Sequence, residues 1–173
     1  MEQILIQVDK SDNVLGTIEK MQAHRQGILH RAFSVFLFTP DGKWILQQRS
    51  LSKYHSAGLW SNTCCGHPLA GEETPVAAQR RLRFEMGIGC PLEEIFSFTY
   101  RAELENGLVE HEYDHIFAGR CATVPYPHPA EVMSWKFVET TELLKDIDIH
   151  PGSYTAWFRQ LIHKVIAHQT NKS

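Results

Sequence analysis

The amino-acid sequence predicts an α+β protein in which helices cover a mixed β-sheet. Short runs of alternating or continuous apolar residues are typical of strands, and two of their connections carry tight-turn signals. Only a few segments have helical periodicity, and they do not alternate regularly with the strands, which disfavours a parallel βαβ winding. A chain of 173 residues that is 43% hydrophobic is long enough to bury one core but short for two. We therefore expect residues 1–173 to form a single domain.

The first half of the chain contains three predicted strands. Residues 3–8 form the first of them. Residues 30–39 and 43–49 flank the turn sequence Pro-Asp-Gly at residues 40–42, where proline presets one turn position and glycine tolerates a positive φ. This pattern predicts a hairpin.

A helix is predicted next, over residues 74–86 (TPVAAQRRLRFEM). Thr74 is suited to be its N-cap and Pro75 its first residue, because the first turn of a helix leaves its N–H groups unpaired and proline has none. Gly87 is suited to end the helix, since glycine readily adopts the left-handed conformation of a C-cap.

The second half contains further strands and a C-terminal helix. Residues 95–104 and 108–120 are joined by Glu-Asn-Gly at 105–107, a strong hairpin signal. Residues 135–138 form another strand, which precedes a short helix. From residue 154 onward, apolar side chains recur at helical spacing and form a stripe that packs against the body. These side chains belong to Trp157, Phe158, Leu161, Ile162, Val165 and Ile166.

Charge and cysteine content limit the classes of function. A formal net charge of −3 gives no excess of basic residues for a nucleic-acid backbone, so we expect no nucleic-acid partner and only a small anionic ligand. The apolar run at the N-terminus is too short for a signal peptide or a membrane span. The adjacent Cys64 and Cys65 do not resemble a disulfide framework. We expect a reduced, cytoplasmic protein with no membrane contact and no obligatory protein partner.

Two carboxylates are the most informative polar residues. Glu110 and Glu112 lie in a predicted strand, so their side chains point to the same face, with Cα atoms roughly 6.6 Å apart. On a buried face the carboxylates would repel each other unless a cation or a proton lay between them, which favours metal binding or acid–base chemistry. An exposed polar face is the alternative, since alternating polar residues are common on half-solvated strands.

A second candidate segment, residues 60–68 (WSNTCCGHP), places Cys65 near His67 in a loop that Gly66 and Pro68 constrain. A thiol held near an imidazole favours chemistry. Taken singly, however, a cysteine is more often a small buried residue, and a histidine is more often hydrogen-bonded in a core than bound to a ligand.

The charged and imidazole side chains suggest a cation site and an anion site. Three imidazoles and two carboxylates form a donor set suited to Mn²⁺, Mg²⁺ or Zn²⁺; the residues are His24, His30, His67, Glu110 and Glu112. The chain has ten histidines, so chance pairs are expected. Four basic residues can bind phosphate oxygens, although each one alone is typical of a solvated surface. They are Lys20, Arg49, Lys53 and Arg81.

In their order and spacing these segments resemble the type I isopentenyl-diphosphate isomerases, a family with a Nudix-like fold. The resemblance spans nearly the whole chain. The matching segments are EKMQAH, HRAFSVFLF, QQRSLSK, WSNTCCGHP, RRLRFEMG, FTYRAEL, LVEHEYDHIF, AEVMSW and the late Trp157. The resemblance implies an α+β, Nudix-like mixed sheet sandwiched by helices.

Residues 66–88 also fit the frame of a Nudix box, with Glu72 and Glu85 at matching positions. Arg81 and Phe84, however, replace two of the acidic residues with which a Nudix hydrolase holds metals against a diphosphate. Such a degenerate box implies a protein that binds a diphosphate without cleaving it.

The resemblance also implies roles for individual residues. Cys65 would be the catalytic thiol and Glu112 the second catalytic residue, with Tyr100 nearby. Trp157 would present its π face to a developing cation, although its place in the apolar stripe is explained equally well by packing. One divalent metal, Mn²⁺ or Mg²⁺ with Zn²⁺ as a further option, would have as ligands His24, His30, His67, Glu110 and Glu112. Glu85 would help hold a Mg²⁺ that bridges to the diphosphate. The implied substrate contacts are Lys20, Arg49, Lys53 and Arg81.

The implied reaction interconverts isopentenyl diphosphate and dimethylallyl diphosphate in isoprenoid biosynthesis. An alkene is protonated at one carbon and deprotonated at another through a carbocation-like state, which requires two groups on opposite faces. Glu112 is expected on the protonating side and Cys65 as the proton acceptor. If Cys65 acts as a thiolate, a nearby cation must lower its pKa from about 8.5.

Two other functions remain open from the residues. A Nudix hydrolase acting on a nucleoside diphosphate derivative would share the fold, but the broken acidic run disfavours it. A non-catalytic module with a structural zinc would favour cysteines in CxxC spacing, whereas this chain has only an adjacent pair.

Overall fold

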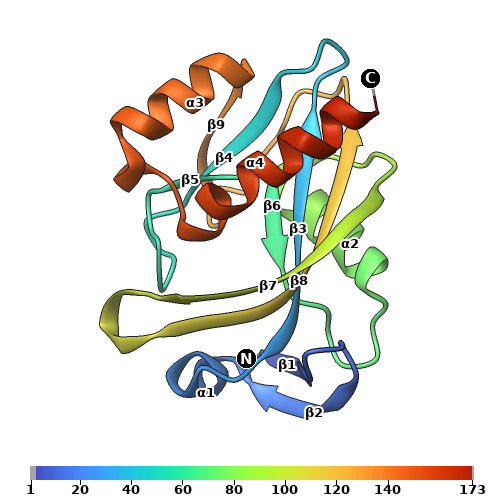
Figure 1. Cartoon of the computed structure of the whole chain (residues 1–173), viewed down its shortest axis with the longest axis vertical. Coiled ribbons are helices and arrows are strands. Elements are labelled where there is room, and N and C mark those ends of the chain that lie inside the picture. The colour runs from blue at the N-terminus through green and yellow to red at the C-terminus, as the bar shows by residue number, and fades with distance from the viewer. Residues whose placement is uncertain (1–2, 173) are drawn as a thin grey trace.

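The computed structural model describes residues 3–172. Its central strand is β3 (His30–Phe38), which lies between neighbours on both sides (Figure 1). The strands β1 (Ile4–Val8), β4 (Trp44–Arg49) and β6 (Cys64–Gly66) pair with it antiparallel. On its other edge β8 (Val109–Arg120) runs parallel to it over the whole length of β3.

Four more strands extend this sheet, all in antiparallel pairing. They are β2 (Val14–Glu19) beside β1, β5 (Trp60–Ser61) and β9 (Val132–Val138) beside β4, and β7 (Glu93–Glu103) beside β8. Within the described residues the sheet has nine strands and mixes parallel with antiparallel pairs. The mixed sheet predicted from the sequence is confirmed.

Helices cover both faces of the sheet (Figure 1). They are α1 (Lys20–Gln26), α2 (Thr74–Met86), α3 (Thr140–Ile149) and α4 (Ala156–Asn171), with single turns of 3₁₀ helix at η1 (Glu105–Gly107) and η2 (Pro151–Ser153). Among residues 3–172, no helix combines the length and the apolar character that crossing a membrane would need.

The two cores follow from the period of two in β3. Phe36 and Phe38 point to one face and pack with the apolar side of α4, including Phe158 and Leu161. On the opposite face, Phe33, Val35 and Leu37 pack with Ala77, Ala78, Leu82 and Met86 of α2. Each large side chain that is fully buried in this way contributes about 1.5–3 kcal/mol to folding. Both faces of β3 are therefore mainly apolar, and its polar residues are His30 and Arg31 at the N-terminal end and Ser34 in the middle.

Both predicted hairpins are present. At the first turn the Thr39 N–H donates to the Lys43 carbonyl over 2.8 Å, and Gly42 has φ of 93°. At the second, Asn106 and Gly107 have φ of 62° and 69°, the positive values that a two-residue hairpin turn needs.

The predicted start of α2 is shifted by one residue. Thr74 is the first helical residue, and Glu73, with φ of −68° and ψ of 136°, is the N-cap. Glu73 is extended while Thr74 already has helical backbone, and no side chain caps the first turn. Gly87 ends the helix as predicted, in the left-handed conformation with φ of 66°.

Candidate active site and metal centre

One cavity of about 170 Å³ opens where α1, β3, β6, β8 and the first turn of α4 meet. Most of the predicted site residues line it. They are Lys20, Arg49, Lys53, Cys65, His67, Arg81, Glu85, Glu110, Glu112 and Trp157. The other three, His24, His30 and Tyr100, are buried behind this lining, with 0–2% of their surface exposed.

Strand β8 turns its acidic residues inward. Glu110, Glu112 and Asp114 are buried, whereas the intervening His111 and Tyr113 are partly exposed. This alternation follows from the period of two in a strand. The alternative of an exposed polar face is therefore wrong, because Glu110 and Glu112 are only 5% and 8% exposed.

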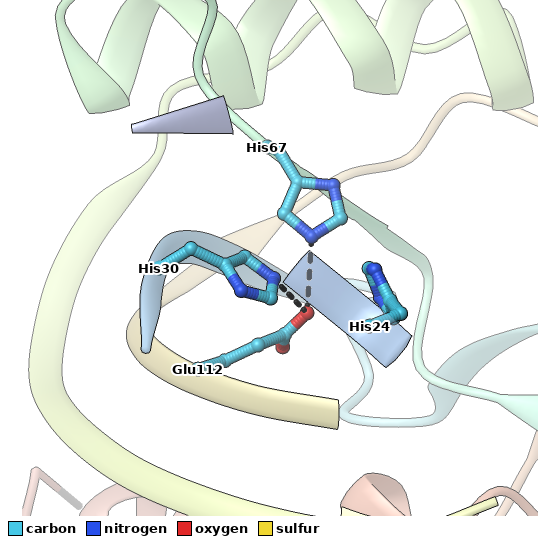
Figure 2. Close-up of side chains that lie close together, drawn as sticks. All are labelled: His24, His30, His67 and Glu112. Atoms are coloured by element: carbon cyan, nitrogen blue, oxygen red, sulfur yellow. Dashed lines mark hydrogen bonds and ion pairs between the residues drawn. The ribbon is translucent and has the colours of Figure 1, made fainter. Parts of the chain in front are cut away.

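Three imidazoles surround Glu112 (Figure 2). His67 follows β6, and its Nε2 atom lies 3.0 Å from Glu112 Oε1. His30 opens β3 beside Glu112 in the parallel register, and its Nε2 atom lies 3.6 Å from the same oxygen. His24 comes from α1. The four side chains offer one donor atom each, and these atoms all lie within 4.8 Å of one another.

Hydrogen bonds to the backbone orient two of these rings. Nδ1 of His24 lies 2.7 Å from the Lys20 carbonyl, and Nδ1 of His30 lies 2.8 Å from the Ile28 carbonyl. Because a carbonyl only accepts, each Nδ1 carries the hydrogen, and the lone pair of Nε2 faces the cluster. Nε2 of His30 is buried without a hydrogen-bond partner.

The donor set fits a divalent metal on these observations. Burial, with the nearby His30 and Lys20, holds the pKa of His67 well below its usual range, so this ring is neutral, as a ligand must be. A buried nitrogen without a partner, such as Nε2 of His30, is costly, and a cation between the rings and Glu112 would satisfy it.

Glu110 forms the other side of the cluster. Its Oε2 atom accepts a hydrogen bond of 2.8 Å from the Tyr100 hydroxyl, and its Oε1 atom lies 3.8 Å from His24 Nε2. Burial opposes a charge on His24, but hydrogen bonds and the charges of Glu110 and Glu112 outweigh it and raise the pKa of His24. Tyr100 therefore acts on Glu110, while it is paired with Glu112 only through the backbone register of β7 and β8.

The two adjacent cysteines point to opposite faces of β6. Cys64 is fully buried in the core under α2, and Cys65 faces the cavity. Burial, followed by the negative charge of Asp114, raises the pKa of Cys65 to about 12. This shift favours the thiol over the thiolate at neutral pH, so Cys65 lacks the lowered pKa that a thiolate would need.

The residue after Cys65 is a glycine in a tightly packed position. A Cβ atom at Gly66 would lie 2.8 Å from the ring of Phe33 and 3.2 Å from the Arg81 side chain. The close approach of β6 to β3 thus positions Cys65 and His67 on either side of a residue without a side chain.

Asn62 holds the thiol and the indole together. Its Oδ1 atom accepts hydrogen bonds from Cys65 Sγ over 3.2 Å and from Trp157 Nε1 over 3.1 Å. Its amide group donates to the carbonyls of Val35 and Cys64. Trp157 belongs both to the core under α4 and to the cavity wall, so packing and contact with a ligand are compatible.

The four predicted basic residues also line the cavity and lie near one another, and we call this part of the wall its basic end. Burial, then repulsion from Lys53, Arg81 and Arg49, lowers the pKa of Lys20 to about 8. Such mutual repulsion marks a place where a polyvalent anion is stabilised. Glu131 forms ion pairs with Lys53 and Arg81, and Glu85 forms one with Arg81.

Arg49 also contacts Trp157, which we call the aromatic wall of the cavity. Its guanidinium carbon lies 5.3 Å from the centre of the Trp157 ring, a cation–π distance. The ring that the family resemblance assigns to a developing cation thus also faces the guanidinium of Arg49.

Sequence reasoning missed several lining residues: Gln3, Ser34, Tyr54, His55 and Glu131. It also missed Asn62, which is buried behind the lining and bonded to Cys65 and Trp157. Tyr54 and His55 directly follow the predicted Lys53, and Asn62 lies inside the WSNTCCGHP segment. Proximity to those motifs was the available signal. It was not sufficient, because the direction of a side chain in an irregular loop does not follow from its sequence.

Comparison with known proteins agrees with this fold. Residues 28–158 match the family model of the NUDIX domain. The crystal structure of DR0079 from Deinococcus radiodurans superposes with a TM-score of 0.77 at 20% identity, covering 94% of this chain and 98% of that one. A MutT protein from Methanosarcina mazei Go1 superposes with a TM-score of 0.66 at 16% identity, covering 84% and 96%. By fold and matched domain, this is a NUDIX-domain protein.

Closer relatives define the family. The isopentenyl-diphosphate Delta-isomerase of Serratia proteamaculans is 45% identical over 172 residues, which cover 99% of this chain and 96% of that protein. Isopentenyl-diphosphate Delta-isomerase 1 of Aromatoleum aromaticum is 50% identical over 167 residues, covering 96% and 94%. The chain belongs to the isopentenyl-diphosphate Delta-isomerase family. The resemblance found in the sequence is confirmed.

Proposed function

We propose that this chain interconverts isopentenyl diphosphate and dimethylallyl diphosphate in isoprenoid biosynthesis. The observation that carries the proposal is that Cys65 and Glu112 line the same cavity, which also contains the four basic residues. A diphosphate would be bound at the basic end, and the five-carbon chain would lie between the thiol and the carboxylate. The family relationship supports this assignment.

The proposed chemistry needs an acid on one side of the alkene and a base on the other. Glu112 and Cys65 take these two roles, and by microscopic reversibility each is the acid in one direction and the base in the other. Because burial raises the pKa of Cys65 to about 12, the resting protein carries a proton on the thiol. In the direction in which Cys65 is the base, this proton first passes to solvent and Glu112 takes one up from solvent, so that after Glu112 has protonated the alkene and Cys65 has removed a proton, both groups are back in their starting forms. Tyr100 positions Glu110, and the indole of Trp157 forms an apolar wall of the cavity.

Two divalent ions complete the proposed centre. The first would be held by His24, His30, His67, Glu110 and Glu112, a nitrogen-rich set that suits Mn²⁺ or Zn²⁺ better than Mg²⁺. Bound there, it would orient Glu112 and adjust its proton affinity. Glu85 would hold a Mg²⁺ that reaches the diphosphate, while Lys20, Arg49, Lys53 and Arg81 would contact phosphate oxygens directly.

The remaining proposals concern the setting of the enzyme. Residues 1–173 act as one isomerase domain in the cytoplasm, with a small molecule as the only required partner and no nucleic acid or membrane. Four cysteines without a disulfide among them support a reducing compartment.

Incubation of the metal-loaded protein with isopentenyl diphosphate in deuterated water tests the activity. We expect dimethylallyl diphosphate that carries deuterium, because the added proton comes from an exchangeable group. Release of phosphate without the isomer would instead establish the hydrolase. No reaction by a protein that binds both metal and inorganic diphosphate would also reject the proposal.

A further inference from the structure

His55 is a buried histidine for which the proposed reaction has no role. It is 4% exposed and lies between the cluster around Glu110 and the aromatic wall. Its ring is stacked near His24, with centroids 6.1 Å apart and planes at 29°, and it meets Trp157 edge-on at 5.9 Å. Its Nε2 atom lies 3.6 Å from Glu110 Oε1.

The surrounding loop fixes this ring from several sides. Nδ1 of His55 lies 3.2 Å from the Ser56 hydroxyl, and the His55 carbonyl accepts a hydrogen bond from Arg49. The Ser56 N–H donates to the Glu105 carboxylate at the tip of the β7–β8 hairpin over 2.6 Å. With Nδ1 directed to Ser56, Nε2 is left facing Glu110 and His24.

The contact between His55 and Glu110 is incomplete as a hydrogen bond. The 3.6 Å between His55 Nε2 and Glu110 Oε1 is longer than the roughly 2.7–3.2 Å of an ordinary N–H···O hydrogen bond. An imidazole nitrogen and a carboxylate oxygen that face each other at this distance are typical partners of a cation between them.

The donor atoms of His55, His24 and Glu110 all lie within 4.8 Å of one another. This group shares His24 with the group of His30, His67 and Glu112, so the two adjoin. We propose that His55 is a metal ligand of this protein, which binds a divalent transition-metal ion through Nε2 together with His24 and Glu110. The ion is of the Mn²⁺, Co²⁺ or Zn²⁺ class, since added imidazole favours these over Mg²⁺.

This inference concerns metal binding and does not depend on the isomerase activity. It is tested on the full chain, stripped of metal, by calorimetric titration with Mn²⁺ and by the visible spectrum of bound Co²⁺, which responds to the number of donors. Because the single free nitrogen of His24 can bind one ion only, His55 would act on the ion that His24 holds, and His55→Ala should weaken Mn²⁺ binding at least about tenfold. It should also change the Co²⁺ spectrum.

Two further variants separate a ligand from a merely structural histidine. His55→Gln keeps a hydrogen-bonding group that reaches Glu110 but is a poor ligand, so it should resemble His55→Ala. His163→Ala removes an exposed histidine of α4 and should match the unmodified chain. The proposal would be overturned if His55→Ala left both the Mn²⁺ affinity and the Co²⁺ spectrum unchanged. It would also be overturned if His55→Gln restored both. Thermal melting of the metal-free variants shows that each is folded.

Discussion

The thiol of Cys65 and the indole N–H of Trp157 donate to the same oxygen atom, Oδ1 of Asn62. One side chain thereby sets the positions of the proposed acid–base group and of the apolar wall beside it. Asn62 is itself fixed, since its amide donates to two backbone carbonyls and only 1% of its surface is exposed.

Asn62→Ala is expected to lower kcat far more than it raises KM. A displacement of the thiol by about 1 Å costs on the order of a hundredfold in rate, while the basic end of the cavity stays intact. The loss of buried hydrogen bonds should also lower the free energy of unfolding by about 2–3 kcal/mol. Steady-state kinetics and urea unfolding measure the two effects.

The matched control is Ser61→Ala. Ser61 also donates to Asn62 Oδ1, over 2.9 Å, so this variant removes one hydrogen bond from the same oxygen without touching Cys65 or Trp157. It should keep most of the activity. Equal losses of kcat in the two variants would show that Asn62 acts through stability and not through position.

Substitution of each cysteine by alanine should distinguish a role in the reaction from a role in core packing. Cys65→Ala should bind metal and melt like the unmodified chain but have no measurable isomerase activity. Cys64→Ala, on the opposite face of β6, should retain activity and lose about 1 kcal/mol of stability. Activity assays, metal analysis and thermal melting check both. Loss of metal and fold in Cys65→Ala would favour a structural role.

Lys20 should impose a pH dependence on substrate capture. Burial and the neighbouring cations lower its pKa to about 8, so in the free enzyme Lys20 is charged below this pH and neutral above it. We expect kcat/KM, which reports free-enzyme groups, to fall as pH rises through this value. Lys20→Arg should remove the inflection, because arginine stays charged up to a pH of about 12.5. An inflection that persists in Lys20→Arg would assign it to another group.

Removal of metal should lower the melting temperature. An ion present at a hundred times its Kd adds about 2.7 kcal/mol to the stability of the folded state, which corresponds to roughly 5–10 °C for a chain of this length. Differential scanning calorimetry with chelator, and after Mn²⁺ is added back, measures the shift. Glu112→Gln should reduce it, and Glu103→Gln on the exposed end of β7 should not. A melting temperature indifferent to chelator would exclude the metal centre.

The hairpin tip should influence substrate affinity from a distance. Glu105 accepts a hydrogen bond from the Ser56 N–H and so holds the loop that follows Arg49 and carries Lys53. Because such a bond to a charged group contributes roughly 1.5 kcal/mol, Glu105→Ala should raise KM by about tenfold, with kcat nearly unchanged. Glu103→Ala is the control. If Glu105→Ala has the KM of the unmodified chain, the loop around Lys53 keeps its conformation without the hydrogen bond to Glu105.

Local patterns were enough to predict most of the sheet. The strands around residues 40–42 and 105–107 were identified because period-two apolar runs and turn residues are local signals. The short β2 and α1 were not predicted as elements. Glu19 caps α1 with its side chain, accepting hydrogen bonds from the Met21 and Gln22 N–H groups, and glutamate is not among the usual N-cap residues.

Contacts between residues that are far apart in the sequence could not be predicted from local patterns. The resemblance to the family supplied the proposed ligands and the choice of Cys65 over Cys64, which the alternation of β6 then explains. The convergence of Asn62, Cys65 and Trp157 depends on the docking of α4 against the sheet. The role proposed for His55 depends on a loop held by Glu105, which lies 49 residues beyond its hydrogen-bond partner Ser56.

The parallel alignment of β3 with β8 has a consequence for how the protein folds. His30 and Glu112 are neighbours only in this register, and a slip of one residue would turn both inward glutamates toward the opposite side of the sheet. A misaligned chain would then lack the pair of ligands altogether. Divalent ions present during refolding should bind only chains in which the two strands have met correctly, and so increase the yield of the native form at the expense of misassembled ones.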